Sequence, residues 1–176
     1  SSTNIDQVIS QIDRMLENGH AYRTKDGVFF DTTKLLDFGA ISNKHRQDLE
    51  PVRRYLQKRY ELDFSLWDYD PSWGIMFQSK YGSGKPHWHI QDTAIAEKYF
   101  GDVVYDIHGA GTDCIYPHHE SLRAILKSLS GKKEPVNFWL HNGLVNINGE
   151  KMSTSKPNTA IFLSDDEKTI RKKISK

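Results

Sequence analysis

The alternation of helical and strand-like patterns between residues 91 and 140 constrains the fold more than any other feature of the sequence. Two helical segments and two short apolar runs follow one another there: 91–100, 103–107, 118–129 and 136–140. Because strands that are separated by helices normally pair in parallel, this order predicts an α/β fold with a parallel sheet.

The first thirty residues carry a different pattern. Apolar residues recur at helical spacing over 5–16, and Gly19 is a natural stop for that helix. Two β-rich runs, 21–23 and 28–30, flank an Asp-Gly pair, which predicts a hairpin. Residues 43–60 are highly charged and are expected to include a helix.

Aromatic side chains alternate with glycines and a proline between residues 63 and 84. Such a loop-rich stretch has two interpretations. The aromatic rings cover a small core beneath a long loop, or they form the wall of a binding cleft.

The length and the composition favour one soluble domain, with two small lobes as the alternative. The 176 residues contain no apolar run near the roughly 18 residues of a membrane helix, and no leader resembles a signal peptide. Cys114 is the single cysteine, so a disulfide within the chain is excluded and the cytoplasm is the expected location. A net charge of +1 gives no strong signal for nucleic acid.

Basic residues nevertheless crowd the carboxyl-terminal end: Lys168, Arg171, Lys172, Lys173 and Lys176. They form either a solvated helix face or a surface that faces RNA.

The segment Asp106–Asp113 lies at the carboxyl end of a predicted parallel strand, where open α/β sheets bind ligands. Small residues such as Gly109 and Gly111 let a flat ligand approach the backbone, and Asp113 could accept hydrogen bonds from ribose hydroxyls. A G-x-G fragment alone is a weak signal, because turn glycines explain it equally well.

A second motif is rich in small hydroxyl residues and lysines and includes Lys151-Met152-Ser153-Thr154-Ser155. Its amides, hydroxyls and lysines suit a triphosphate that gains charge as pyrophosphate leaves. The alternative is an ordinary surface loop of lysine and serine.

Histidines gather in the same half of the chain: His87, His89, His108, His118 and His119. Their density favours a site over separate structural roles. Metal binding is one use of such a cluster, but the sequence has no Cys-x-x-Cys and the spacing matches no common zinc pattern.

Several segments resemble those of cysteinyl-tRNA synthetases in the same order and at the same spacing: 84–90, 100–113, 117–120, 139–143 and 151–155. They resemble G-R-P-G-W-H-I, D-I-H-G-G-G-x-D with its lead-in, P-H-H-E, W-x-H-x-G and K-M-S-K-S. Residues 18–22 and 63–67 resemble the connective segment of that family, so the resemblance covers nearly the whole chain.

The resemblance implies a partial Rossmann-type class I synthetase sheet with an inserted α+β connective segment. Residues 1–84 would be the connective segment, and 85–176 the second half of the nucleotide-binding catalytic fold with the ATP loop at 151–155. In that family, cysteine and ATP form cysteinyl-adenylate, and the acyl group passes to tRNA. ATP with Mg2+, an amino acid and tRNA are therefore the implied substrates and partners.

The resemblance also implies roles for individual positions. The ATP loop would contain Lys151, Ser153, Thr154 and Ser155. The ATP and adenylate would be bound by Trp88, His89, His108, Gly109, Gly111 and Asp113. The amino-acid pocket would contain Trp88, Asp92 and His118.

This chain departs from the family pattern at the zinc site. The cysteine of W-H-I-E-C is Asp92, the family's histidine remains as His118, and the glutamate of P-H-H-E-N-E falls on Leu122. Cys114 stands where the family has an apolar residue, and it is interpreted as a core residue. We therefore expect no metal site, and zinc in particular is not expected.

Other departures concern ATP. Nothing matches the family's H-I-G-H segment, the second lysine of the ATP loop is Thr154, and 156–166 resembles tryptophanyl enzymes more than cysteinyl ones. Three hypotheses follow: part of an active synthetase, a diverged or truncated paralogue with altered amino-acid specificity, or a non-catalytic RNA- or protein-binding domain. If the H-I-G-H half is absent, the exposed sheet edge would favour association with that half or with another copy.

Overall fold

A computed structural model describes residues 2–51, 57–69, 72, 74–132, 134–147, 149–153, 167, 168 and 171. The long helices of the described part are α1 (Ile5–Glu17), α2 (Trp88–Phe100) and α3 (Glu120–Ser130). Its strands are β1 (Ala21–Arg23), β2 (Gly27–Phe30), β3 (Phe64–Asp68), β4 (Lys85–Pro86), β5 (Tyr105–Gly111), β6 (Val136–Asn142), β7 (Asn146–Ile147) and β8 (Glu150–Lys151).

The amino-terminal predictions are largely confirmed. Apolar residues at helical spacing form α1, and the backbone N–H of Gly19 donates to the carbonyl of Leu16 at its end. β1 and β2 form the expected antiparallel hairpin. Of the charged segment 43–60, the described part contains only a short 3-10 turn at Arg46–Asp48, and 52–56 lies outside the described residues.

Strands β1 to β4 form one antiparallel sheet in sequential order. The aromatic stretch 63–84 begins with β3, which pairs with both β2 and β4. Trp67 of β3 and Tyr81 are buried in the core, so the interpretation of these rings as core residues holds for both. Trp73 lies outside the described residues.

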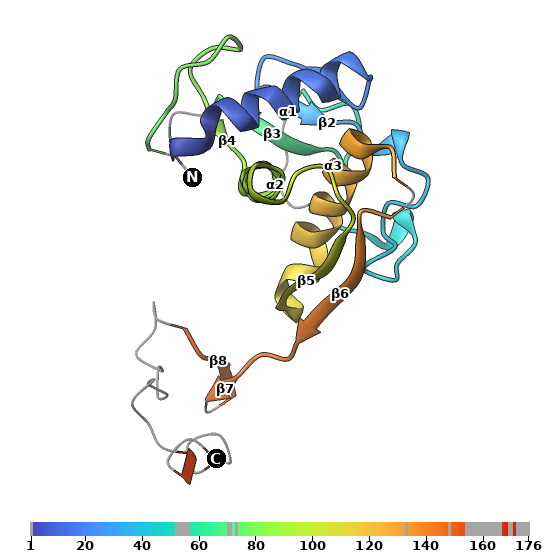
Figure 1. Ribbon diagram of the computed structural model, residues 1–176, viewed down its shortest axis with the longest axis vertical. Helices are drawn as coiled ribbons and strands as arrows, with labels where there is room; N and C mark the ends of the chain where they lie inside the picture. Colours follow the sequence, from blue (N-terminus) through green and yellow to red (C-terminus); the bar gives the residue numbers. More distant parts are fainter. Residues whose placement is uncertain are drawn as a thin grey trace.

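A single hydrophobic core joins this sheet to the helices. Ile12 of α1, Ile90 of α2 and Ile125 of α3 are fully buried in the same cluster as Leu66 and Trp67. In Figure 1, α2 and α3 lie between the antiparallel sheet and the second sheet of the molecule. The core therefore contains residues from both 1–84 and 85–176, so the two parts of the chain pack against each other.

The second sheet is the predicted parallel pair, with β5 and β6 joined by α3. The expected strand at 103–107 was placed too early, because β5 runs to Gly111 and pairs there with Asn142. Gly109 and Gly111 therefore lie in the strand and not in a turn after it. A ladder of backbone hydrogen bonds needs no side chains, so small residues do not end it.

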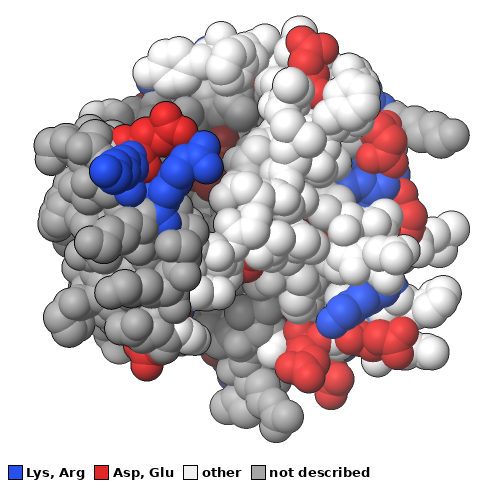
Figure 2. Space-filling model, turned by 90° about the horizontal axis from the view of Figure 1, so that it is seen from below, with Lys and Arg blue, Asp and Glu red and all other residues white. Residues whose placement is uncertain are grey.

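One face of the parallel pair is open. Ile107 and Phe138 lie opposite each other, Leu140 follows on the same face, and these side chains are 61%, 64% and 54% exposed. Figure 2, seen from below, shows a broad band of uncharged side chains in the described part, with charged side chains at its margins. Parallel sheets are normally covered on both faces, so this face is unusual for the sheet type.

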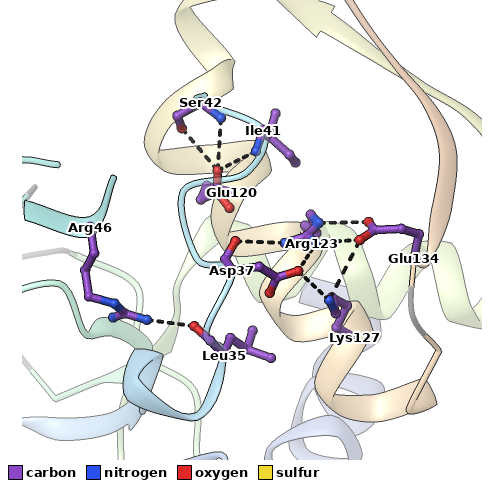
Figure 3. A network of polar contacts seen from close by, with 9 residues as sticks. All are labelled: Leu35, Asp37, Ile41, Ser42, Arg46, Glu120, Arg123, Lys127 and Glu134. Carbon is purple, nitrogen blue, oxygen red and sulfur yellow. Dashed lines mark hydrogen bonds and ion pairs between the residues drawn. The ribbon is translucent and has the colours of Figure 1, made fainter. Parts of the chain in front are cut away.

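Polar contacts fasten the segment after β2 to α3 (Figure 3). The buried Oε2 of Glu120 accepts hydrogen bonds from the backbone N–H groups of Ile41 and Ser42 and from the Ser42 hydroxyl. Arg123 donates to both Asp37 and Glu134. Burial alone would raise the pKa of Asp37, but the hydrogen bonds from Arg123 and Lys127 outweigh it and lower the pKa to about 2.

Gly84 is needed where its backbone meets the indole of Trp67. A methyl group at this position would lie 2.0 Å from Nε1 of Trp67. We expect Gly84→Ala to lower the free energy of unfolding by about 1–3 kcal/mol, the usual cost of overpacking. Urea denaturation measures this change in stability. Gly143→Ala is the control, because the added methyl group would have no atom within 4 Å and the φ of Gly143 is ordinary. Gly82→Ala would be less informative. A Gly84→Ala variant as stable as Gly143→Ala would contradict this packing.

Candidate functional site

The predicted histidine cluster exists, and it joins the start of α2, the start of α3 and the parallel sheet. Its rings lie in a chain of neighbours, with centroids 4.3 Å apart for His87 and His89, 5.0 Å for His89 and His118, 5.5 Å for His118 and His119, and 4.7 Å for His108 and His119. The chain of rings therefore connects segments of the chain that are separate in sequence.

Asp92, His118 and His89 form a line of hydrogen bonds within this cluster. Nε2 of His118 lies 3.0 Å from Oδ2 of Asp92, and Nδ1 of His118 lies 2.7 Å from Nδ1 of His89. A carboxylate only accepts, so Nε2 of His118 donates to Asp92. When His118 is neutral, its Nδ1 then accepts the proton of Nδ1 of His89.

Trp88 covers this line from one side. Its ring stacks on His118 with centroids 3.8 Å apart and planes 10° apart. Trp88 remains about half exposed, while His118 is buried. The stacking and the two hydrogen bonds together fix the orientation of the His118 ring.

His141 belongs to the same cluster, although it was not among the histidines predicted to form it. Its Nε2 lies 2.8 Å from Nδ1 of His119, and Trp139 packs against the rings of both His108 and His119, with centroids about 5 Å from each. Trp139 pairs with His108 across β5 and β6, and His141 lies two residues further along the same face. The period of two in a predicted strand could have revealed this residue.

Burial keeps several of these rings uncharged. It lowers the pKa of His89 well below 6.5, and the neighbouring His87 and His118 add to the effect. Burial and the histidines around it lower the pKa of His119 to about 3. Burial also lowers the pKa of His108.

A cavity of about 570 Å³ lies between α2 and β5, and Asp92 and His108 both line it. Apolar side chains make up most of the remaining wall, among them Ile95, Leu122 and Leu126. A mostly apolar hollow with a few polar groups is the usual form of a small-molecule site.

The predicted nucleotide residues meet beyond the end of β5. Lys151 of β8 forms an ion pair with Asp113, and its hydrogen bond lowers the pKa of the Asp113 carboxyl. A methyl group on Gly111 would lie 2.5 Å from Oδ1 of Asp113, so the glycine makes room for that carboxylate. Gly109 has no such neighbour and leaves the open face of the sheet accessible.

The structure describes only some of the remaining predicted residues. Ser153 is half-buried, and Thr154 and Ser155 lie outside the described residues, as does 156–166. Of the basic carboxyl-terminal residues, Lys168 and Arg171 are described, and Arg171 pairs with Glu167 one helical turn earlier. Cys114 is only partly buried and does not belong to the core, so its interpretation as a core residue was wrong. Cys114 lies in the short 3-10 turn Thr112–Cys114, which follows β5 directly.

The donor set at the expected zinc position does not fit a zinc ion held by four side chains. The atoms of Asp92 and His118 that could bind a metal point at each other, and Leu122 contributes a buried apolar side chain. The chemistry of this position therefore differs from that of a thiolate zinc site.

Comparison with known proteins gives the family. The model of the class I (C) tRNA synthetase catalytic domain matches residues 1–173. The chain belongs to the cysteinyl-tRNA synthetase family. It is 47% identical to the cysteine–tRNA ligase of Thermoplasma volcanium over 161 residues, which cover 88% of this chain and 34% of that protein. It is 44% identical to that of Thermoplasma acidophilum, over 90% of this chain and 35% of that protein.

The cysteine–tRNA ligase of Methanococcus maripaludis is 42% identical over 88% of this chain and 33% of its own length. This synthetase-family chain thus spans about a third of the relatives that it matches. Its mixed α/β content and parallel sheet agree with a class I synthetase domain. None of the helices in the described residues is long and apolar enough to cross a bilayer.

Proposed function

We propose that this chain forms the ATP-loop side of an aminoacyl-tRNA synthetase centre, which activates an amino acid with ATP for transfer to tRNA in the cytoplasm. The contact between Lys151 and Asp113 is the observation that carries this proposal. One residue comes from the segment that resembles the ATP loop and the other from the segment that resembles the adenosine site. Asp113 and Lys151 are 38 positions apart in sequence, yet their side chains are in contact, as they would be in a shared nucleotide site.

The two residues would exchange partners when ATP binds. Nζ of Lys151 would leave the Asp113 carboxylate and donate to the phosphates, where it stabilises the charge that grows as pyrophosphate leaves. Asp113 would then accept hydrogen bonds from the ribose hydroxyls. Mg2+ bound with ATP would supply further neutralisation of the phosphates.

No side chain needs to act as a nucleophile in this reaction. The carboxylate of the amino acid attacks the α-phosphate, so the protein contributes positioning and charge stabilisation. Gly109 and Gly111 would let the adenylate approach β5, and Trp88 and His89 would lie beside it at the start of α2.

The remainder of the centre lies outside these 176 residues under this proposal. The open face at Ile107, Phe138 and Leu140 would be covered by the H-I-G-H half of a Rossmann-type sheet or by another copy of the chain. Residues 1–84 would act as the inserted connective segment and 85–176 as the catalytic half.

Replacing Lys151 tests the proposal. We expect Lys151→Ala to weaken ATP binding to the chain by about tenfold or more, because charge-assisted hydrogen bonds contribute about 1.5–3 kcal/mol. Isothermal titration calorimetry with ATP and Mg2+ measures this, and ATP–pyrophosphate exchange with a panel of amino acids provides a second measurement. Lys132→Ala is the matched control, because Lys132 pairs with Asp102 at the opposite end of β5.

Equal ATP affinity in the Lys151→Ala and Lys132→Ala variants would contradict the assignment of the ATP loop. A wild-type chain that binds tRNA but no ATP would instead favour the alternative of a non-catalytic RNA-binding domain. The basic residues near the carboxyl-terminal end are the sequence feature that supports this alternative.

A further inference from the structure

We propose, resting on the function above, that Asp92 and His118 select an amino acid whose side chain ends in a hydrogen-bond donor, a hydroxyl or an ammonium group. The mismatch between this donor set and a zinc site motivates the proposal. A position that would otherwise hold a thiolate ligand offers a carboxylate whose second oxygen is available for a substrate.

The free oxygen is the first piece of evidence. Oδ2 of Asp92 contacts Nε2 of His118, whereas Oδ1 has no hydrogen-bond partner among the described residues. The side chain is 49% exposed and lines the cavity between α2 and β5. Oδ1 therefore remains an acceptor at the wall of a hollow that is large enough for an amino acid.

The rigidity of the pair is the second piece of evidence. Trp88 stacks on His118, and Nδ1 of His89 lies 2.7 Å from Nδ1 of the same ring. His118 is thus held on its face and at both ring nitrogens. An acceptor that is oriented before binding loses less entropy when a ligand arrives, so this carboxylate is suited to recognition.

The chemistry of the carboxylate sets the class of ligand. An ionised Asp92 accepts hydrogen bonds and attracts positive charge, so hydroxyl and ammonium groups are favourable partners. A thiol is a weak donor, and a thiolate would be repelled. A site that offers a polar group also rejects analogues without the matching donor, because its own group then stays unpaired. Serine and 2,3-diaminopropionate would therefore bind in preference to alanine and cysteine.

The test follows the His118 ring by NMR in the full 176-residue chain, with the histidines labelled with carbon-13. Serine, 2,3-diaminopropionate, alanine and cysteine are titrated in turn, the last with and without zinc. We expect saturable shifts of the His118 signal with serine or 2,3-diaminopropionate, at affinities at least tenfold above that for alanine. Saturation by serine alone identifies the hydroxyl class, and saturation by 2,3-diaminopropionate alone identifies the ammonium class.

Asp92→Ala should abolish these shifts, and Asp92→Asn should weaken binding of the ammonium ligand more than that of serine. Asp102→Asn is the matched control, because this exposed carboxylate pairs with Lys132 away from the cavity. A chain that binds none of the four amino acids would overturn the proposal, as would zinc-dependent binding of cysteine or unchanged binding in Asp92→Ala.

ATP–pyrophosphate exchange separates this inference from the proposed function. Selective binding that depends on Asp92, without ATP binding or exchange, would retain the recognition site and refute the synthetase role. ATP binding that depends on Lys151, without selective amino-acid binding, would do the reverse.

Discussion

Replacing Trp67 by alanine is expected to lower the free energy of unfolding by about 3–5 kcal/mol, the typical cost of removing a large aromatic side chain from a core. Trp67 is fully buried on β3, in the middle of the antiparallel sheet. Gly84 lies against the indole of Trp67, and the backbone of Trp67 lies close to Gly27. The loss is a large share of the roughly 5–15 kcal/mol that stabilises a domain.

Urea denaturation followed by circular dichroism measures this effect. Trp67→Phe is the informative partner, because it keeps an aromatic ring and removes a buried indole N–H that has no hydrogen-bond partner in the described part of the chain. We expect Trp67→Phe to cost much less than Trp67→Ala. Leu36→Ala serves as the surface control, since Leu36 is 99% exposed. Equal stability of the Trp67→Ala and Leu36→Ala variants would show that Trp67 is not a core residue.

Acidification is expected to destabilise the chain steeply below about pH 6.5, because histidines of the cluster are buried in the neutral form. Burial lowers the pKa of His89 and of His119, the latter to about 3, while both regain ordinary values near 6.5 on unfolding. Between the folded and unfolded pKa values, the unfolded chain binds protons that the folded chain does not. The free energy of unfolding therefore falls as the pH falls, by about 1.4 kcal/mol per pH unit for each such histidine.

Urea denaturation at intervals between pH 8 and pH 5 gives this slope. His119→Gln should make the slope shallower by about 1.4 kcal/mol per pH unit, the contribution of one histidine, whatever its effect on stability at pH 8. His45→Gln should leave the slope unchanged, because His45 is exposed and lies outside the cluster. If His119→Gln retained the full wild-type slope, the proton uptake would have to come from other groups.

The pattern of the sequence was sufficient for α1, the first hairpin and the parallel pair. In each of these, local periodicity and the direction of the chain agree with the packing that is observed. β3 was hidden, because Trp67 and its neighbours are buried on both sides and do not alternate in polarity. Side-chain pattern also failed to place the end of β5, where glycines continue a backbone ladder.

The site was predictable as a set of residues but not as a set of contacts. Histidine density indicated the cluster, yet the pairing of His119 with His141 depends on the register of β5 and β6. The resemblance to synthetases placed Asp92 and His118 in one pocket. Only the geometry shows that Asp92 turns one oxygen toward His118 and leaves the other available.

Under the proposal that a partner covers the open face of β5 and β6, the stability of this chain depends on the concentration of that partner. Any partner that covers Ile107, Phe138 and Leu140 binds the folded chain and not the unfolded one, so mass action links docking to folding. Each tenfold rise in the concentration of such a partner above its dissociation constant would add about 1.4 kcal/mol to the folded state. A melting temperature for this chain therefore has meaning only when the concentration of whatever covers the sheet is stated with it.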